Sequence, residues 1–331
     1  MSITTDSGED FARLAEPFRR ELIAYGYRML ASVDDAEEVV QEVYLQAWRA
    51  YDRFEGRSSL RTWLYRIATR AFVRALEQRK RRPLPSDLHA PEADPTAQFL
   101  ACDSELPWLQ PAPDSLLQAT TTDPATVVAA RETMRLAFVA ALQILPPRQR
   151  AVLILRDVLG WSAAEVAALL DLTVVAVNSA LQRARTRLPA DTHSLVQPSE
   201  ARERELLDRY VAAFQNADVG ELVAVLAEDA RYEMPPFLTW FEGGAPVGAF
   251  LGARLRGFGK TPVLRTSANG QPAIALYPAT TDGQHRLHAL HVLTIGPNGI
   301  DRIVAFMDID ALARFGLPQK YSANYPVAGP A

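Results

Sequence analysis

An acidic, proline-rich segment divides the first two thirds of this 331-residue chain into two parts. Residues 83–125 contain eight prolines and seven aspartates or glutamates, but no lysine or arginine. Proline at that density blocks a continuous helix, so the segment is expected to be extended or partly disordered. Within it, the stretch ELPWLQPAPDSLL carries apolar residues that indicate docking onto a surface. We therefore predict two helical domains, residues 10–82 and 126–188, joined by an acidic linker.

The composition is that of an ordinary globular protein, with 48% apolar residues, 22% charged residues and a formal net charge of −4. The N-terminus, MSITTDSGEDFARL, lacks the basic start and apolar core of a secretory signal. No apolar run approaches the roughly 20 residues that a membrane helix needs. The single cysteine, Cys102, excludes an intrachain disulfide. These features predict a cytoplasmic protein with no membrane segment and no cofactor.

The last third, residues 200–318, has a different pattern. Two helices are expected over 200–227, and apolar strand-type stretches follow: RYEMP, PVLRTSA, PAIALYP, HRLHALHVLTIG and IDRIVAFMDI. The sequence PNG at 297–299 predicts a hairpin turn. Helices followed by a run of strands indicate an α+β domain, so the fold class is multidomain, all-α and then α+β.

A strongly basic helix is predicted near the end of the first domain. From Arg57 to Arg82 there are nine basic residues and one acidic residue. At helical spacing, one face carries Leu60, Leu64, Ile67, Ala71 and Ala75, while a neighbouring row carries Arg66, Arg70 and Arg74, with Trp63 beside it. Guanidinium groups suit phosphates, and exposed aromatic rings stack on unpaired bases. The pattern therefore fits a surface that binds single-stranded nucleic acid. The alternative is a basic face exposed to solvent, with a buried tryptophan.

The second helical domain has the pattern of a helix-turn-helix. Ser162 and Glu165 form a capping-box pair, and the first helix is expected to end near Leu170. A tight DLT turn follows, with Thr173 capping the second helix. Val177, Ala180, Leu181 and Ala184 are expected to face inward, leaving polar and basic side chains outward. The second helix of such a motif enters the DNA major groove, although helical hairpins also occur in proteins that never bind DNA.

The helix DDAEEVVQEVYLQAWRAY begins with acidic residues, which complement the helix dipole. Its mixed acidic and apolar surface suits either a core helix or a partner-binding helix. Together, DDAEEVVQEVYLQAWRAYDRFEGRSSLRTWLYRIATR and LPPRQRAVLILRDVLGWSAAEVAALLDLTVVAVNSALQRARTRL resemble regions 2 and 4 of bacterial extracytoplasmic-function sigma factors.

The resemblance implies a function and partners. Such a factor binds the β′ and β subunits of core RNA polymerase and directs initiation at promoter DNA. It implies that region 2 recognises and melts the minus-10 element, that region 4 reads the minus-35 element, and that the linker passes through polymerase. Many members have Asn where this chain has Arg70, which implies a phosphate contact there rather than a base contact.

The resemblance also assigns site residues. The implied polymerase-binding residues are Asp35, Glu38, Val39, Gln41, Glu42, Leu45 and Trp48. The minus-10 residues are Arg57, Arg61, Trp63, Arg66, Arg70 and Arg74. The minus-35 residues are Thr173, Asn178, Ser179, Gln182, Arg183 and Arg185.

Residues 200–318 resemble a SnoaL-like domain of the cone-shaped NTF2-like superfamily. Candidate pocket residues are Tyr232, Trp240, His291 and Asp308. An aspartate beside a histidine suits acid–base chemistry, but core packing and a helix cap explain the same residues, and no metal site or enzyme activity is expected. The domain is predicted to be a built-in regulator. The alternatives are a SnoaL-like enzyme, or a domain that senses an unknown small ligand, fused to a DNA-binding module.

Overall fold

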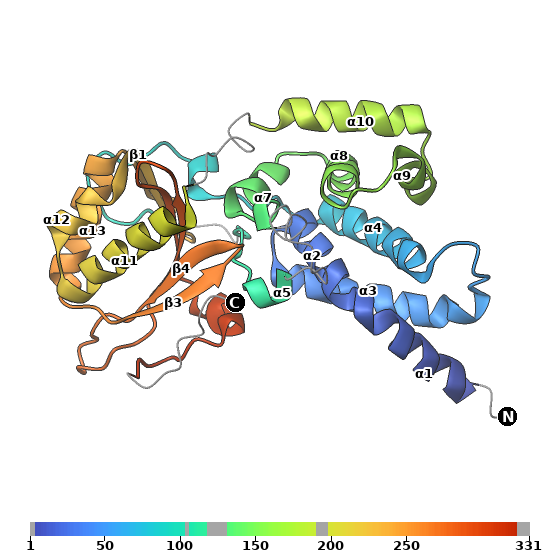
Figure 1. Cartoon of the computed structure of the whole chain (residues 1–331), viewed down its shortest axis with the longest axis horizontal. Coiled ribbons are helices and arrows are strands. Elements are labelled where there is room, and N and C mark those ends of the chain that lie inside the picture. The colour runs from blue at the N-terminus through green and yellow to red at the C-terminus, as the bar shows by residue number, and fades with distance from the viewer. Residues whose placement is uncertain (1–3, 103–105, 118–130, 190–197, 323–331) are drawn as a thin grey trace. The chain divides into compact units, whose positions relative to one another are not determined.

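The computed structural model describes residues 4–102, 106–117, 131–189 and 198–322. The chain forms two compact units, one made of residues 1–82 and 115–192 and the other of residues 83–114 and 193–331 (Figure 1). Most of the acidic linker therefore packs with the C-terminal domain, although in sequence it lies between the two helical domains.

The first unit begins with four helices: α1 (Thr4–Ala15), α2 (Arg19–Leu30), α3 (Val33–Ala50) and α4 (Leu60–Gln78). Ser32 caps α3 by accepting a hydrogen bond from the Asp35 N–H, and Ser59 caps α4 in the same way. The rings of Tyr25 and Tyr65, 5.4 Å apart, lie in the centre of the bundle. This part of the structure is all-α, as predicted.

The second helical group of this unit contains α7 (Leu136–Leu142), α8 (Pro147–Leu153), α9 (Ala163–Leu170) and α10 (Val174–Arg187). Ser162 and Glu165 form the predicted capping box, and Thr173 caps α10 as predicted. Helices α9 and α10 are bent by 102° from each other, within the range of a helix-turn-helix. No described helix is long and apolar enough by itself to cross a membrane; only α9 and α10 counted together pass that test.

The two helical groups share one hydrophobic core. The buried Arg150 of α8 donates hydrogen bonds to the carbonyl oxygens of Met29 on α2, Gln143 and Leu145. Burial lowers the pKa of Arg150 to about 9. Removing one partner of a buried, hydrogen-bonded charge is expensive, so this arginine ties α8 to α2.

The C-terminal unit contains a six-stranded sheet in the order β2-β1-β6-β5-β4-β3. The strands are β1 (Leu226–Glu233), β2 (Trp240–Glu242), β3 (Val263–Ala268), β4 (Gln271–Leu276), β5 (Ala289–Ile295) and β6 (Ile300–Phe306). The β1–β6 pair is parallel, and the other neighbouring pairs are antiparallel. Every predicted strand-type stretch overlaps a strand, whereas the three-residue β2 was too short to be predicted.

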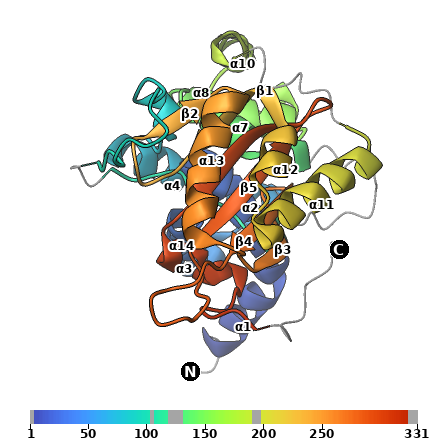
Figure 2. The same cartoon turned by 90° about the vertical axis from the view of Figure 1, so that its left-hand side faces the viewer.

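The helices of this unit are α11 (Glu200–Asn216), α12 (Val219–Ala224), α13 (Gly244–Phe258) and α14 (Ile309–Leu312). Leu206, Tyr210 and Phe214 of α11 and Phe250 of α13 join the strands in one core. Figure 2 shows α13 in front of the strands of the sheet. The four-residue α5 (Asp114–Leu117) lies within the linker. The α+β class predicted for this part of the chain is confirmed.

Candidate nucleic-acid interface

The basic helix α4 buries a wider face than its apolar periodicity indicated. Leu64 and Ala75 are buried as expected, while Leu60, Ile67 and Ala71 are only half-buried. The remaining inward positions are Tyr65, Ala68, Thr69 and Phe72. Polar residues can lie inside because the Thr69 hydroxyl donates to the Tyr65 carbonyl at 2.7 Å and is 3.1 Å from the Tyr25 hydroxyl.

Trp63 lies at the edge of this core, as the sequence indicated. Its ring is half-buried and packs against Phe54, with the ring centroids 4.9 Å apart. Arg57, on the loop before α4, is exposed and forms an ion pair with Glu55 at 2.5 Å. Arg74 is also exposed.

Arg61 binds to other side chains of the first unit. Its guanidinium forms an ion pair with Glu21 of α2 and lies 5.1 Å and 5.4 Å from the ring centroids of Tyr65 and Trp161. The Tyr65 hydroxyl donates to the same Glu21 carboxylate at 2.9 Å. Burial, together with the charge of Glu21, holds the pKa of Tyr65 well above its ordinary value. The sequence did not indicate these partners of Arg61.

Arg66 and Arg70 both bind one carboxylate. Arg66 Nη2 lies 2.7 Å from Asp171 Oδ1, and Arg70 binds the other oxygen, Oδ2. Asp171 caps the C-terminus of α9 with a left-handed backbone, φ 56°. The hydrogen bonds from Arg70 and Arg66 lower the pKa of the Asp171 carboxyl. We name these three residues the Asp171 latch. It connects the basic row of α4 to the turn of the helix-turn-helix.

Helix α10 presents a more open face. Val177, Ala180, Leu181 and Ala184 are buried as predicted. The exposed residues include Thr173, Asn178, Gln182 and Arg183, and Ser179 is half-buried. Arg185 differs from these, because it donates two hydrogen bonds to Asp157, at 2.8 Å and 2.7 Å.

Helix α3 exposes Gln41, Glu42, Leu45 and Trp48 on one face. Leu45 and Trp48 are 50% and 53% exposed, and together with Phe11 and Tyr44 they line a shallow apolar hollow. Asp35 and Glu38 of the same helix bind the arginines after α4: Asp35 binds Arg79 and Arg82, and Glu38 binds Arg79. Val39 is a core residue, 3% exposed, so its side chain has no surface to offer a partner; apolar character alone did not distinguish it from Leu45.

Comparisons with known proteins identify the family of this chain. A family model described as Sigma-70 region 2 matches residues 14–82, and one described as Sigma-70, region 4 matches residues 135–188. The ECF RNA polymerase sigma factor SigG of Mycobacterium tuberculosis is 46% identical over 315 residues, which cover 93% of this chain and 84% of SigG. The chain belongs to the extracytoplasmic-function sigma factors. It binds core RNA polymerase and directs transcription initiation at promoters.

Two further relatives match different extents of this sigma factor. The ECF RNA polymerase sigma-E factor of Escherichia coli is 31% identical over 162 residues, which cover 49% of this chain and 76% of sigma-E. The crystal structure of SigJ from Mycobacterium tuberculosis shares the fold over 92% of this chain and 98% of SigJ, with a TM-score of 0.61 and 21% identity. The architecture with a further domain after region 4 is therefore not peculiar to this sigma factor.

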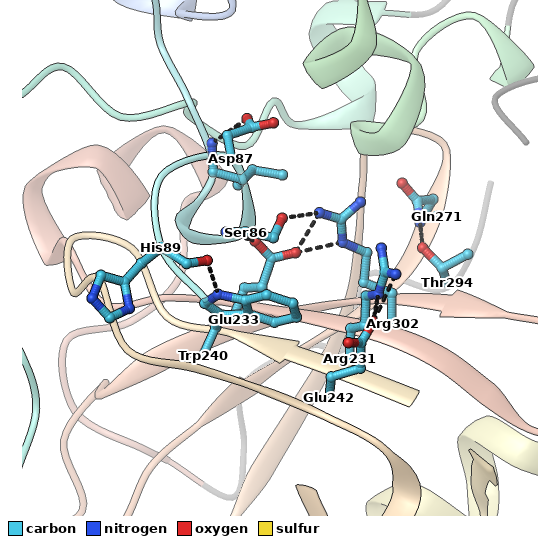
Figure 3. Close-up of polar contacts among 11 residues, drawn as sticks. Ser86, Asp87, His89, Arg231, Glu233, Trp240, Glu242, Gln271, Thr294 and Arg302 are labelled. Carbon is cyan, nitrogen blue, oxygen red and sulfur yellow. Dashed lines mark hydrogen bonds and ion pairs between the residues drawn. The ribbon is translucent and has the colours of Figure 1, made fainter. Parts of the chain in front are cut away.

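In the C-terminal unit of the sigma factor, three sets of contacts bind the linker to the domain, and we name them the linker clips. In the first, Glu233 of β1 accepts a hydrogen bond from the Ser86 N–H at 3.1 Å and forms an ion pair with Arg302 of β6 (Figure 3). The Glu233 side chain is fully buried. Trp240 of β2 donates its indole N–H to the His89 carbonyl at 2.8 Å, and its own carbonyl accepts from the Glu92 N–H at 2.8 Å.

The second clip is centred on Leu100 and Phe99. The Leu100 carbonyl accepts from the Leu238 N–H at 2.8 Å, and the Leu100 N–H donates to Thr239 Oγ1 at 2.7 Å. The Phe99 ring packs on Phe237, with centroids 4.8 Å apart, and beneath the Arg254 guanidinium at 4.3 Å.

The third clip is reciprocal. The Ala112 N–H donates to Asn269 Oδ1, and the Asn269 N–H donates to the Ala112 carbonyl, both at 2.9 Å. Asn269 is fully buried with φ 58°, a conformation that Asn tolerates better than most residues. The Gly270 N–H then donates to Asp114 Oδ1 at 2.7 Å. Sequence reasoning indicated docking of the linker, but it did not identify these partners.

The candidate pocket residues do not form one site. The hydroxyls of Tyr210 and Tyr232 lie 2.9 Å and 3.2 Å from the two ring nitrogens of His291. Trp240 instead contacts the linker. Asp308 is exposed and caps α14, which was the structural alternative for this residue. Within the described ranges, no group of three His, Cys, Asp or Glu side chains is arranged to hold a metal ion.

Proposed function

We propose that the C-terminal domain regulates initiation by competing with polymerase for the linker. The observation that carries this proposal is that the three linker clips bind Ser86, His89, Glu92, Leu100 and Ala112 to the domain mainly through main-chain groups. A linker that passes through polymerase, as in other sigma factors of this group, must leave such a site. Binding of the linker to the C-terminal domain and its passage through polymerase are therefore mutually exclusive states.

Each clip consists of a few hydrogen bonds, so the linker can be released from the domain reversibly. Each neutral hydrogen bond contributes about 0.5–1.5 kcal/mol net, and one to a charged group contributes about 1.5–3 kcal/mol. The Glu233–Arg302 pair remains intact when the linker leaves, so release of Ser86 opens no unpaired charge. Polymerase can displace a set of contacts of this size when its channel binds the same acidic segment.

The proposal keeps the residue roles that the resemblance implies. The α3 face of Gln41, Glu42, Leu45 and Trp48 binds the β′ subunit of polymerase. The α4 arginines and Trp63 bind minus-10 DNA, and the polar face of α10 binds the minus-35 element. Support for the α3 assignment comes from the exposed Trp48, because tryptophan is enriched among the residues that dominate protein interfaces.

An enzymatic role for the C-terminal domain is disfavoured by the position of His291. Its side chain is 2% exposed, and both of its ring nitrogens face tyrosine hydroxyls. Burial, with a smaller contribution from His288, lowers the pKa of His291 to about 3. A base that is buried and weakly basic does not suit proton transfer to a substrate. The regulatory role also needs no small ligand.

Run-off transcription with purified core polymerase tests the regulatory role. The double variant Trp240→Phe, Asn269→Gly removes two clip hydrogen bonds while retaining an aromatic ring and a residue suited to positive φ. We expect it to increase transcript yield about threefold or more at limiting sigma factor, because the linker is released more easily.

The matched control is Arg265→Gln, which breaks an exposed ion pair with Asp208 in the same domain and touches no clip. It should transcribe like the unaltered protein. If the double variant, folded by circular dichroism, gives the same yield as this control, competition for the linker is not how the domain acts.

A further inference from the structure

Val175 is the most exposed large apolar side chain in the part of the chain that the structure describes, at 74%. It lies in the first turn of α10, two residues after the cap Thr173, whose side chain accepts from the Ala176 N–H at 3.1 Å. The cap fixes this turn as helix, so the direction of the Val175 side chain is set by the backbone.

The helical position of Val175 is the centre of the solvent face. At about 100° per residue it lies opposite the buried Ala184, and Asn178, Ser179 and Gln182 follow it at i+3, i+4 and i+7 on the same side. An apolar group therefore stands at the end of a row of hydrogen-bonding side chains. Nothing in the core requires a valine there.

We infer that Val175 contacts the 5-methyl group of a thymine in the minus-35 element. The inference rests on the proposed assignment of α10 as the helix that reads this element. The N-terminal residues of a recognition helix contact base edges, and the thymine methyl is the apolar group that base edges present in the major groove. Valine cannot bond to a phosphate, so its contact would select a base.

A protein partner fits this position less well. Interface anchors are mostly aromatic residues or arginine in the centre of an apolar patch. Val175 is instead surrounded by amide and hydroxyl side chains, which are the groups that pair with base edges. Val174 offers a contrast, because it is 43% exposed and lies about 100° away on the flank of the same turn.

The experiment uses the full-length protein bound to core polymerase. A preferred upstream element is first selected from a pool of duplexes randomised over the minus-35 region. Each thymine of that element is then replaced singly by deoxyuridine, which lacks only the methyl group. Dissociation constants are measured for the unaltered protein, Val175→Ala and the matched control Val174→Ala.

We expect one deoxyuridine substitution to weaken binding by the unaltered protein and by Val174→Ala roughly threefold to fivefold, the scale of one buried methyl group. Val175→Ala should bind the thymine and uracil duplexes equally at that position. Equal uracil penalties in the unaltered protein and Val175→Ala overturn the inference, as does the absence of any penalty. A uniform loss on both duplexes in Val175→Ala also overturns it, because that result indicates a backbone or protein contact.

The two levels of the argument can fail separately. If no upstream element is selected, or if Asn178→Ala leaves upstream selection unchanged, the assignment of α10 is wrong. If selection works and depends on Asn178 while the uracil test fails, only the role of Val175 is wrong.

Discussion

Helices α4 and α10 are both basic, but the structure presents them differently. On α4, Arg61 is bound to Glu21, and Arg66 and Arg70 share the Asp171 carboxylate. On α10, Asn178, Gln182 and Arg183 are exposed, and Arg185 is the residue bound to a carboxylate. The comparison teaches that counting arginines locates a nucleic-acid surface but does not say whether its charges are available. On the proposed assignments, α10 presents its polar side chains to DNA in this state, whereas Arg66 and Arg70 of α4 must first exchange the Asp171 carboxylate for phosphate.

The largest effect on DNA discrimination is expected on α10. Here the loss of Asn178, an exposed residue proposed to contact a base, is compared with the loss of Arg185, which is paired with Asp157. Asn178→Ala should reduce discrimination for the minus-35 element about tenfold, since a side-chain amide that contacts a base contributes roughly 1–3 kcal/mol of discrimination. Arg185→Ala should reduce it much less, because DNA must compete with Asp157 for this guanidinium. Gel-shift titrations of the holoenzyme on matched and scrambled upstream elements measure both. A greater loss for Arg185→Ala would reverse the comparison.

A smaller effect is expected from opening the Asp171 latch. Asp171→Asn removes the charge but keeps a residue that tolerates the left-handed conformation. The free protein should then bind non-specific duplex about threefold tighter, with a steeper salt dependence, because Arg66 and Arg70 become available to phosphates. Fluorescence anisotropy at several salt concentrations provides the measurement.

Asp157→Asn is the matched control for the latch, since it frees the single Arg185 on α10. It should raise the salt slope by about one phosphate contact, against about two for Asp171→Asn. Equal slopes for the two variants would mean that Arg66 and Arg70 do not reach DNA.

The smallest expected effect is that of pH on the latch. The hydrogen bonds from Arg70 and Arg66 lower the pKa of Asp171 below the ordinary value of a free aspartate. A carboxyl with a depressed folded pKa contributes its stability above the unfolded pKa and loses it as the pH falls through the folded pKa. Between about pH 5.5 and 8, the unaltered protein and Asp171→Asn should therefore differ in DNA affinity by a constant ratio. A ratio that changes across this range would show that another group titrates in the latch.

Local features of this sigma factor were predictable from sequence, and long-range partners were not. The capping box of Ser162 and Glu165, the Thr173 cap and the inward face of α10 depend on residues within one or two turns of each other. Arg61 and Trp161 are a hundred residues apart, so no periodicity connects them. The inward position of Tyr65 was missed for a related reason, because its hydroxyl is satisfied by Glu21 on another helix.

The C-terminal domain shows the same limit. Strand-type stretches predicted an α+β class, but Tyr210 on α11 and His291 on β5 meet only in the folded core. Asp308 followed a strand and was considered for both a pocket and a cap; sequence spacing did not separate the two. The apolar residues of the linker indicated a docking surface, while the identity of that surface depended on the turn between β3 and β4, where Asn269 and Gly270 contact Ala112 and Asp114.

The linker clips also affect how this protein can evolve. They hold Ser86, His89, Leu100 and Ala112 mainly by amide N–H and carbonyl groups, which every residue except proline supplies in full. Phe99 and Asp114 also contribute their side chains, and the Ser86 hydroxyl accepts a hydrogen bond from Arg302 at 3.4 Å. Substitutions at exposed positions of the segment, such as Leu100, can thus adapt it to the interior of polymerase while its main-chain hydrogen bonds to the domain remain, so the two selective demands need not conflict there.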